Sequence, residues 1–248
     1  KWNSWVKWCN FVKDLLSPKI NDYKTYQSKI NIYHFIIELF NLVKKNSIIV
    51  AADGAATVVP NQVGYLNNGV RYIANSGSAS MGYELPAAIG AATASKKKII
   101  CLAGDGSLMM NLQELNTIKA LKLNVIIFLI NNDGYLSIKQ TQKNFFKREF
   151  GSSPKSGLYF PNFQKIAKSF DIDFVELKLK NWKKVLKKIL KKKGPLFVNI
   201  NVDKIQEFEP KLKSWKIKNK IFTPSLEEMY PFLNKKKIDL IMKELNED

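Results

Sequence analysis

Two short turn sequences in the middle of the chain carry the residues best suited to hold a metal ion. The first is Gly-Asp-Gly-Ser at 104–107, and the second is Asn-Asn-Asp-Gly at 131–134. Each follows an unbroken apolar run, and a helix-length stretch lies between them. Carboxylate and amide oxygens suit Mg²⁺, which proteins usually hold with one or two carboxylates together with substrate phosphates. The two turns therefore predict a Mg²⁺ site in which Asp105 and Asn132 are ligands.

The small residues around Asp105 favour a phosphate ligand beside the metal. Gly104 and Gly106 have no Cβ, so the backbone can approach a phosphate closely. Ser107 adds a hydroxyl and an amide near the start of the next helix, where anions are favoured. The Asp-Gly pair at 133–134 allows a tight turn, which makes the carbonyl of Gly134 a candidate third metal ligand. Each turn alone is typical of an ordinary loop, and only their pairing favours a site for a diphosphate bridged by Mg²⁺.

Alternating strands and helices supply the scaffold that these turns need. The apolar runs predict strands, and the amphipathic or small-residue stretches predict helices. The predicted strands are 47–53, 98–105, 124–132, 173–177 and 195–202, and the predicted helices are 31–45, 81–95, 111–121, 161–170 and 181–190. This order predicts an α/β fold, a doubly wound parallel sheet flanked by helices on both faces. Ligands bind beyond the carboxyl ends of the strands in such sheets, so Asp105 and Asn132 meet if their strands are neighbours.

The chain divides into three expected parts. Residues 1–30 form a short linker helix from a preceding domain, 31–205 form the cofactor domain, and 206–248 form a C-terminal helical arm with a last helix at 235–245. Trp2, Trp5 and Trp8 share one helix face and are expected to meet a partner surface. Because the sequence begins with Lys1, we expect a fragment, a processed chain or a trimmed sequence.

Composition favours some classes of protein over others. The chain has 248 residues, 46% of them hydrophobic, and a formal net charge of +19. Only Arg71 and Arg148 are arginine, so the charge is almost all lysine, which indicates a general composition bias more than a nucleic-acid surface. No apolar run reaches about 18 residues, so we expect no membrane span. Cys9 and Cys101 predict neither a disulfide framework nor a zinc site, and a reducing cytoplasm is expected.

Three motifs, in order, resemble the carboxy-terminal, diphosphate-binding domain of thiamine diphosphate-dependent enzymes of the acetolactate synthase group. They are MGYELPAAIGAA at 81–92, GDGSLMMNLQEL at 104–115 and LINNDGYLSI at 129–138. The likeness runs from about residue 31 to 202, and the Trp-rich start resembles the link from that group's central domain. It implies thiamine diphosphate and Mg²⁺ as cofactors, with Asp105, the Asn132 side chain and the Gly134 carbonyl as metal ligands. The cofactor-binding residues that it implies are Met81, Gly104, Asp105, Gly106, Ser107, Asn132, Gly134 and Tyr135.

Met81 illustrates what the resemblance adds to the spacing of the residues. Its spacing alone predicts plain core packing, whereas the resemblance implies the bulky apolar residue that holds the cofactor in a bent shape. His34 is the only histidine and lies in a predicted helix away from the strand ends, so we expect no catalytic role for it. Glu84 and Glu114 have no role assigned from the sequence.

The resemblance also implies a function, that of a 2-oxo acid decarboxylase or carboligase, which is a carbon–carbon lyase or transferase. In this group the activating Glu lies in a pyrimidine-binding domain, usually on a neighbouring subunit. No catalytic residue can therefore be named in this chain, which we expect to be inactive alone. We expect a homodimer or homotetramer, a small 2-oxo acid substrate and no nucleic-acid or membrane partner. FAD, which many such enzymes hold in the central domain, would lie outside these residues.

Two segments depart from the acetolactate synthase pattern. The stretch DGAATVV at 53–59 replaces a Gly-Gln-His-Gln segment, and YLSIKQTQ at 135–142 replaces a Gly-Met-Val segment. Both border the substrate in that group, so acetolactate synthesis and a carboligation in sugar biosynthesis stay equally open. One half of a two-polypeptide decarboxylase is a further alternative. A remote one is a non-catalytic basic binding module, which would have no affinity for thiamine diphosphate.

Overall fold

The computed structural model describes residues 2–17, 19–204, 206–212, 214–217, 220–226, 228–230 and 234–246. The chain falls into two compact units. One unit comprises 23–206, and the other comprises 1–22 together with 207–248. The three-part division expected from the sequence stays a prediction, and its boundary residue 205 lies outside the described residues.

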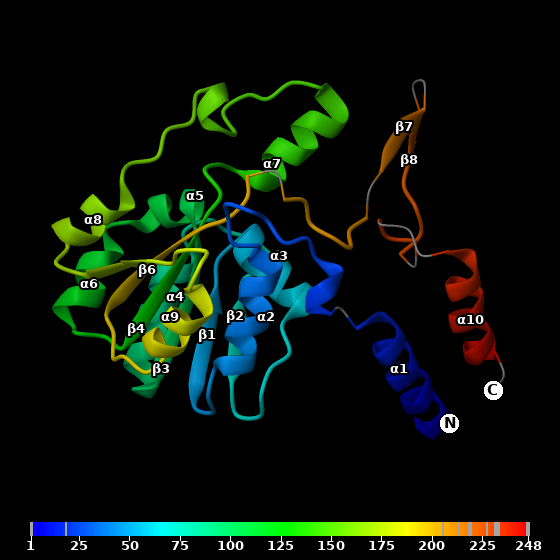
Figure 1. Cartoon of the computed structure of the whole chain (residues 1–248), viewed down its shortest axis with the longest axis horizontal. Helices are drawn as coiled ribbons and strands as arrows, with labels where there is room; N and C mark the ends of the chain where they lie inside the picture. Colours follow the sequence, from blue (N-terminus) through cyan, green and yellow to red (C-terminus); the bar gives the residue numbers. More distant parts are fainter. Residues whose placement is uncertain are drawn as a thin grey trace. The chain divides into compact units, whose positions relative to one another are not determined.

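The larger unit is built on a parallel sheet with the strand order β2-β1-β3-β4-β6-β5 (Figure 1). Every pair of neighbours in this sheet is parallel. The strands are β1 (Ser47–Ala51), β2 (Arg71–Ala74), β3 (Lys98–Gly104), β4 (Val125–Asn131), β5 (Asp173–Glu176) and β6 (Leu196–Asn201). The central strands β1, β3, β4 and β6 are almost wholly buried, as expected for continuous apolar runs covered on both faces.

Helices cover both faces of this sheet (Figure 1). On one face, α4 (Glu84–Ser95), α6 (Glu114–Ala120) and α8 (Phe163–Ser169) form a core with Ile99, Cys101 and alternate residues of β1 and β4. On the other face lie α2 (Ile32–Leu42), α3 (Ala55–Val63) and α9 (Trp182–Ile189), where Phe35 contacts both Phe128 and Trp182. The predicted doubly wound α/β fold is therefore confirmed.

Local signals explain where several of these elements begin and where the predicted bounds were inaccurate. Asn31 caps α2, since its side chain accepts a hydrogen bond from the Tyr33 amide. The helix predicted at 111–121 begins only at Glu114, after α5 (Asp105–Leu108) and the 3-10 turn η2 (Met109–Asn111). The edge strand β2 and the helix α3 were not predicted from the sequence. β2 has only four residues, and α3 contains Pro60, which is unfavourable inside a helix.

The segment that follows β4 contains helical turns that were not predicted from the sequence. It contains α7 (Leu136–Thr141), the π-helical turn η3 (Gln142–Phe146) and the 3-10 turn η4 (Pro154–Ser156). The residues on this segment that face solvent include large apolar ones such as Phe146 and Tyr159.

The second unit consists of short elements. They are α1 (Trp2–Leu16), the 3-10 turn η1 (Ile20–Asp22), the antiparallel pair β7 (Trp215–Ile217) and β8 (Lys220–Phe222), and α10 (Lys235–Asn246). Trp5 stacks on Trp8, and the indole of Trp8 donates to the Ile241 carbonyl at 3.0 Å, which joins α1 to α10. The strands β7 and β8 were not predicted, because the sequence indicated only a helical arm in this part of the chain. Among the described helices of the whole chain, none combines the length and apolarity needed to cross a membrane.

Candidate functional site

Strand pairing brings the two predicted turns to one edge of the sheet. β3 and β4 are hydrogen-bonded neighbours, and Gly104 lies opposite Ile130. Asp105 is the first residue after β3, and Asn132 is the first residue after β4. The condition on which the sequence prediction rested is therefore met, and both side chains line one pocket at the carboxyl ends of the strands. We call this cavity of about 80 Å³ the strand-end pocket.

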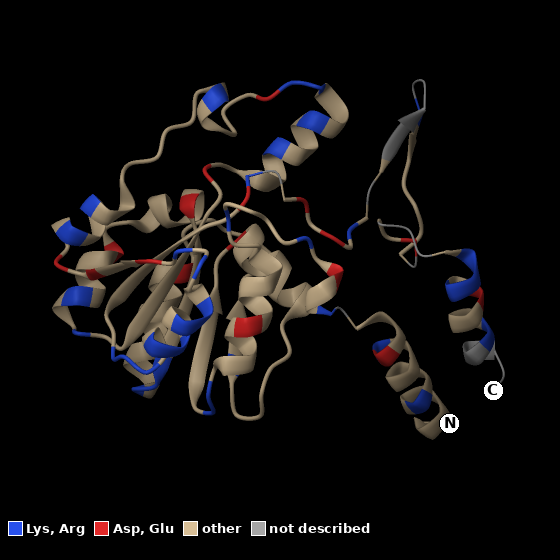
Figure 2. Cartoon of the chain, viewed as in Figure 1, with Lys and Arg blue, Asp and Glu red and all other residues tan. Residues whose placement is uncertain are grey.

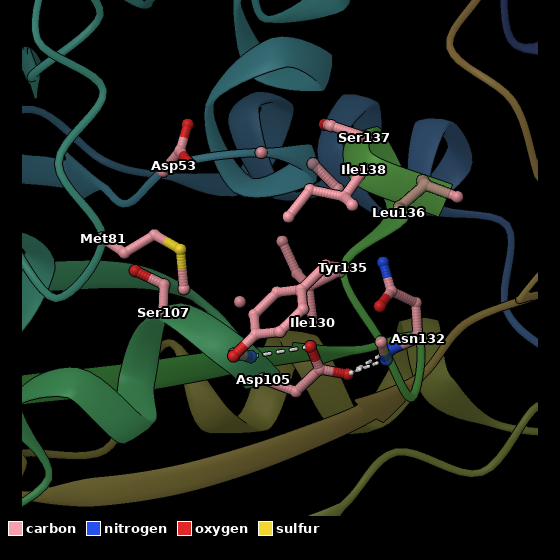
Figure 3. Close-up of a pocket in the computed structure, with 15 residues that line it drawn as sticks. Asp53, Met81, Asp105, Ser107, Ile130, Asn132, Tyr135, Leu136, Ser137 and Ile138 are labelled. Carbon is pink, nitrogen blue, oxygen red and sulfur yellow. Dashed lines mark hydrogen bonds between the residues drawn. The ribbon is translucent and has the colours of Figure 1, made fainter. Parts of the chain in front are cut away.

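Asp105 binds the second turn through that turn's backbone. Its Oδ2 accepts the amides of Asn132 at 3.0 Å, Asp133 at 2.6 Å and Gly134 at 3.2 Å (Figure 3). Its Oδ1 accepts the Gly106 amide at 2.8 Å. One carboxylate thus fixes the shape of both turns, while Oδ1 keeps room for a further partner.

Burial has a large electrostatic effect on this carboxylate. Asp105 is only 2% exposed. Burial raises its pKa to about 7, although the four amide hydrogen bonds act in the opposite direction. A cation close to Oδ1 would stabilise the ionised form and oppose the effect of burial.

The side-chain oxygen of Asn132 gives the clearest sign that a ligand belongs in this pocket. Its Oδ1 is buried and accepts no hydrogen bond within the described residues. Buried polar atoms are nearly always paired, so an orphan that lines a pocket indicates a missing ligand. Figure 3 shows Asn132 and Asp105 on one side of the pocket, with the ring of Tyr135 between them and Met81.

The oxygen donors here fit Mg²⁺ with a phosphate ligand. Within the described ranges, no three His, Cys, Asp or Glu side chains come together as a metal site. A metal at this pocket would therefore have one carboxylate, one side-chain amide oxygen and, for the rest, backbone carbonyls such as that of Gly134 and ligands from the substrate side. That is the usual arrangement for Mg²⁺, which prefers few protein carboxylates and substrate phosphates.

Gly106 is in close contact with the ring of Tyr135. A Cβ placed on Gly106 would lie 2.1 Å from Cε1 of Tyr135, which no real contact allows. Gly134 is restricted in the same way, because a Cβ there would lie 2.5 Å from the Ser152 carbonyl oxygen. The amide of Tyr135 donates to that same oxygen at 3.0 Å. Glycine is thus required at both turns by the close approach of neighbouring atoms.

Ser107 differs from its expected role in one respect. Its hydroxyl donates to Oε2 of Glu84 at 2.8 Å and accepts the Gly82 amide at 2.8 Å. A hydroxyl has one proton, so in this arrangement Ser107 has none to donate to a phosphate. Its backbone amide, in the short helix α5, is the group left for that task, and the predicted contact with a diphosphate stays a prediction.

Sequence reasoning gave no role to two acidic residues near the pocket. Asp53 is the second residue after β1, and it lines the strand-end pocket. Glu84 is completely buried at the start of α4, and burial raises its pKa to about 7, with the charge of Asp53 adding to the effect. An acid at the end of the strand predicted at 47–53 could have indicated Asp53, and an acid inside a small-residue run could have indicated Glu84.

The other residues considered from the sequence lie elsewhere or line the pocket. Met81 and Gly104 line it, and their predicted contacts with the cofactor stay predictions. A ring nitrogen of His34 lies 3.0 Å from the Tyr23 carbonyl, and His34 is not a lining residue. Glu114 begins α6 and does not line the pocket either.

Comparisons with known proteins point to the same region of the chain. The family model described as "Thiamine pyrophosphate enzyme, C-terminal TPP binding domain" matches residues 53–200. The acetolactate synthase isozyme 1 large subunit of Escherichia coli (strain K12) is 32% identical over 180 residues, which cover 72% of this chain and 32% of that protein.

Two further relatives show the same pattern of coverage. The acetolactate synthase large subunit of Porphyra purpurea is 37% identical over 141 residues, covering 56% of this chain and 24% of that protein. That of Buchnera aphidicola subsp. Schizaphis graminum (strain Sg) is 32% identical over 216 residues, covering 84% and 36%. The chain thus spans between about a quarter and a little over a third of the length of these relatives.

Proposed function

Because this chain belongs to the thiamine pyrophosphate enzymes and matches their C-terminal TPP-binding domain, we propose that it binds the Mg²⁺-diphosphate of thiamine diphosphate in a 2-oxo acid decarboxylase or carboligase. The observation that carries the proposal is the buried Oδ1 of Asn132, which has no partner among the residues that the structure describes and lies beside the Asp105 carboxylate at the adjoining ends of β3 and β4.

Each residue of the pocket has a task in this proposal. Asp105 and Asn132 contribute one oxygen each to Mg²⁺, and the carbonyl of Gly134 is the third protein ligand. Gly104, where an added Cβ would meet no atom closer than 3.9 Å, leaves the backbone open to the diphosphate, whereas the ring of Tyr135 fills the space beside Gly106. Met81, on the far side of the pocket in Figure 3, supports the cofactor's bent shape. When bound, thiamine diphosphate provides the electron sink for decarboxylation of a 2-oxo acid.

The activating Glu is proposed to come from a pyrimidine-binding domain outside these 248 residues, supplied by a neighbouring subunit of a homodimer or homotetramer. This chain then orients the cofactor and shields it from water, but does not by itself activate the pyrimidine. The expected result is that the chain alone does not decarboxylate pyruvate. Measurable CO₂ release by the purified chain would contradict this part of the proposal.

Two reactions stay open, acetolactate synthesis and a carboligation in sugar biosynthesis, and one observation bears on the choice between them. Asp53 and Ala55, from one departing segment, and Leu136 and Ile138, from the other, line the strand-end pocket. The segments that differ from the acetolactate synthase pattern thus border the cofactor site, which favours a 2-oxo acid or acceptor other than that of the synthases. A screen of 2-oxo acids with the pyrimidine-binding partner present decides between them.

Calorimetry with thiamine diphosphate and Mg²⁺ tests the cofactor proposal. Asp105→Ala and Asn132→Ala should each weaken Mg²⁺-dependent binding by about tenfold or more, since each removes a metal ligand from a buried site. Asn116→Ala, at an exposed position on α6, is the matched control and should bind as the parent does. If the Asn132 variant bound as tightly as its control, the metal assignment would be wrong. A parent chain without affinity, even with its partner domain, would overturn the proposed function.

A further inference from the structure

Glu84 is a buried acid whose hydrogen bonds lead toward the cofactor pocket. It is the first residue of α4 and is completely buried. Its Oε2 accepts the Ser107 hydroxyl at 2.8 Å, while Oε1 is buried without a partner within the described residues. Burying a carboxyl is unfavourable, so a position of this kind indicates a specific task for the group.

The hydrogen bonds continue from Ser107 to the peptide beside Met81. The Gly82 amide donates to Ser107 Oγ at 2.8 Å, and the Gly82 carbonyl accepts the Asn111 side-chain amide at 2.9 Å. Gly82 has a φ of +82°, and an added Cβ would lie 2.8 Å from the Cβ of Met110. Gly82 is therefore held at both its amide and its carbonyl, which belong to the two peptides on either side of it.

The carboxyl of Glu84 decides the orientation of the Ser107 hydroxyl. That hydroxyl has a single proton, and Glu84 accepts it, so a lone pair faces the Gly82 amide. The groups that face Glu84 from the packed elements are Asp53, after β1, whose charge acts on it, and Cys101 of β3, whose thiol donates to the Glu84 carbonyl at 3.7 Å. Neither replaces Glu84 as the acceptor for Ser107.

We propose that Glu84 is a positioning residue: through Ser107 it holds the Gly82 amide and thereby fixes Met81 beside the 104–107 turn. Its importance for the cofactor rests on the proposed function, whereas the hydrogen-bond relay itself does not. The relay fixes the distance between Met81, which supports the cofactor in the proposed function, and the 104–107 turn, which receives the diphosphate.

Amide hydrogen exchange at Gly82 tests the relay without any cofactor. Glu84→Leu removes the acceptor and should raise exchange at Gly82 by about three- to tenfold, the range expected for one lost hydrogen bond. Ser107→Ala should have a similar effect, and the double variant should add nothing further because both changes break one relay. Glu84→Gln keeps an acceptor oxygen and should restore the parent's protection. Exchange at Ile127, in β4, serves as the control for a general loss of stability.

Two outcomes would overturn the proposal. One is an amide exchange rate at Gly82 that is the same in Glu84→Leu as in the parent. The other, which remains informative if that variant does not fold, is a Glu84→Gln variant whose Gly82 is as exposed to exchange as in Ser107→Ala. Thiamine diphosphate affinity, measured with Mg²⁺, should fall by about tenfold in Glu84→Leu and stay near the parent's in Glu84→Gln. If the parent binds no cofactor but the exchange pattern holds, the proposed function fails and the relay stands.

A second inference comes from an independent feature at the opposite edge of the sheet. A cavity of about 530 Å³, which we call the lysine cavity, is lined by Lys44, Lys45, Lys98, Lys187 and Lys191 and by no acidic residue. It lies where β1 and β3 begin and α9 ends, and Figure 2 shows basic residues gathered around the end of α9. In the part of the chain that the structure describes, none of these five lysines forms an ion pair.

The lysine cavity also has apolar walls. Leu42, Val43, Ile100 and Leu190 line it beside the lysines, and the half-buried Leu42 and Leu190 are the ones that present apolar surface to it. Lys98 is tied to the end of α9, where its ammonium group donates to the Lys192 carbonyl at 2.8 Å. Partial burial and the nearby charge of Lys44 lower the pKa of Lys98, so the cluster is one that an anion would stabilise.

The geometry points to a nucleoside diphosphate as the ligand of the lysine cavity. Its volume falls within the range of about 300–1,000 Å³ typical of small-molecule pockets. The phosphates would lie among the lysine ammonium groups, and the base and sugar would cover the apolar wall. A bare phosphate would leave that wall unused.

Calorimetry with ADP tests this site. Lys44→Glu with Lys187→Glu should weaken ADP binding by about tenfold or more, because two favourable charges become unfavourable. Lys165→Glu with Lys168→Glu, at exposed positions on α8, makes the same change in net charge and should alter affinity less than about twofold. Equal binding by the two double variants, or none by the parent, would overturn the proposal. Tripolyphosphate binding as tightly as ADP would contradict the role of the apolar wall, and tighter binding of an RNA oligonucleotide would make this a nucleic-acid surface.

Discussion

Glu84 gives the sharpest prediction about the pH dependence of stability. The side chain is completely buried, and burial, with the charge of Asp53 adding to it, raises its pKa from an ordinary 4.5 to about 7. In the unfolded chain the carboxyl ionises at its ordinary pKa, while in the folded chain it stays protonated over a further range of pH. The perturbation is Glu84→Gln, which keeps the size of the side chain and removes the ionisation.

The magnitude and the sign follow from the two pKa values. They differ by about 2.5, from 4.5 to about 7, and each pKa unit corresponds to about 1.4 kcal/mol. Because the folded pKa is the higher one, the contribution of Glu84 to the free energy of unfolding is complete below pH 4.5. It is lost as the pH rises to about 7, by about 3 kcal/mol in total.

Urea unfolding of the parent and of Glu84→Gln between pH 4 and pH 8.5 measures this loss. The free energy of unfolding of the variant, minus that of the parent, should rise by about 3 kcal/mol between pH 4.5 and pH 7 and then level off. The unpaired amide of Gln adds a constant cost that does not vary with pH. Asp105 is present in both proteins, so its own titration cancels in the difference. A difference that stays flat with pH would refute the reasoning, since Glu84 would then have one pKa in both states.

Three further changes test the turns and the core by urea or thermal unfolding. Gly106→Ala places a Cβ 2.1 Å from the ring of Tyr135 and should cost about 1–3 kcal/mol. By contrast, Gly90→Ala on α4 meets nothing within 4 Å and should stabilise by about 0.5–1 kcal/mol, so an equal loss in both variants would contradict the contact argument. Phe128→Ala, in a fully buried strand, should cost about 3–5 kcal/mol, and a cost below about 1 would count against the assigned core. Asn31→Ala removes the α2 cap and the side chain's hydrogen bonds with the Lys24 carbonyl and the Gln206 amide, and should cost about 1–3 kcal/mol, whereas no change would mean that these hydrogen bonds are not needed.

Much of the larger unit could be predicted because its signals are local. The runs that became β3 and β4 are apolar without alternation, which indicates burial on both faces. Asp105 and Asn132 could be placed at strand ends from these runs alone. Short elements such as β2 could not be found, since four residues carry too little pattern to distinguish a strand from a loop.

The sequence by itself determined the alternation of strands and helices, the doubly wound fold, and the placing of Asp105 and Asn132 at strand ends. These follow from hydrophobic periodicity and turn chemistry, which act over a few neighbouring residues. Only the tertiary structure decided that the Asn132 amide oxygen lacks a partner in the described part of the chain and that the Ser107 hydroxyl turns to Glu84, 23 residues away. Hydrogen bonds between residues distant in the chain depend on distances and angles that only the packed fold defines, so no local pattern could have predicted them.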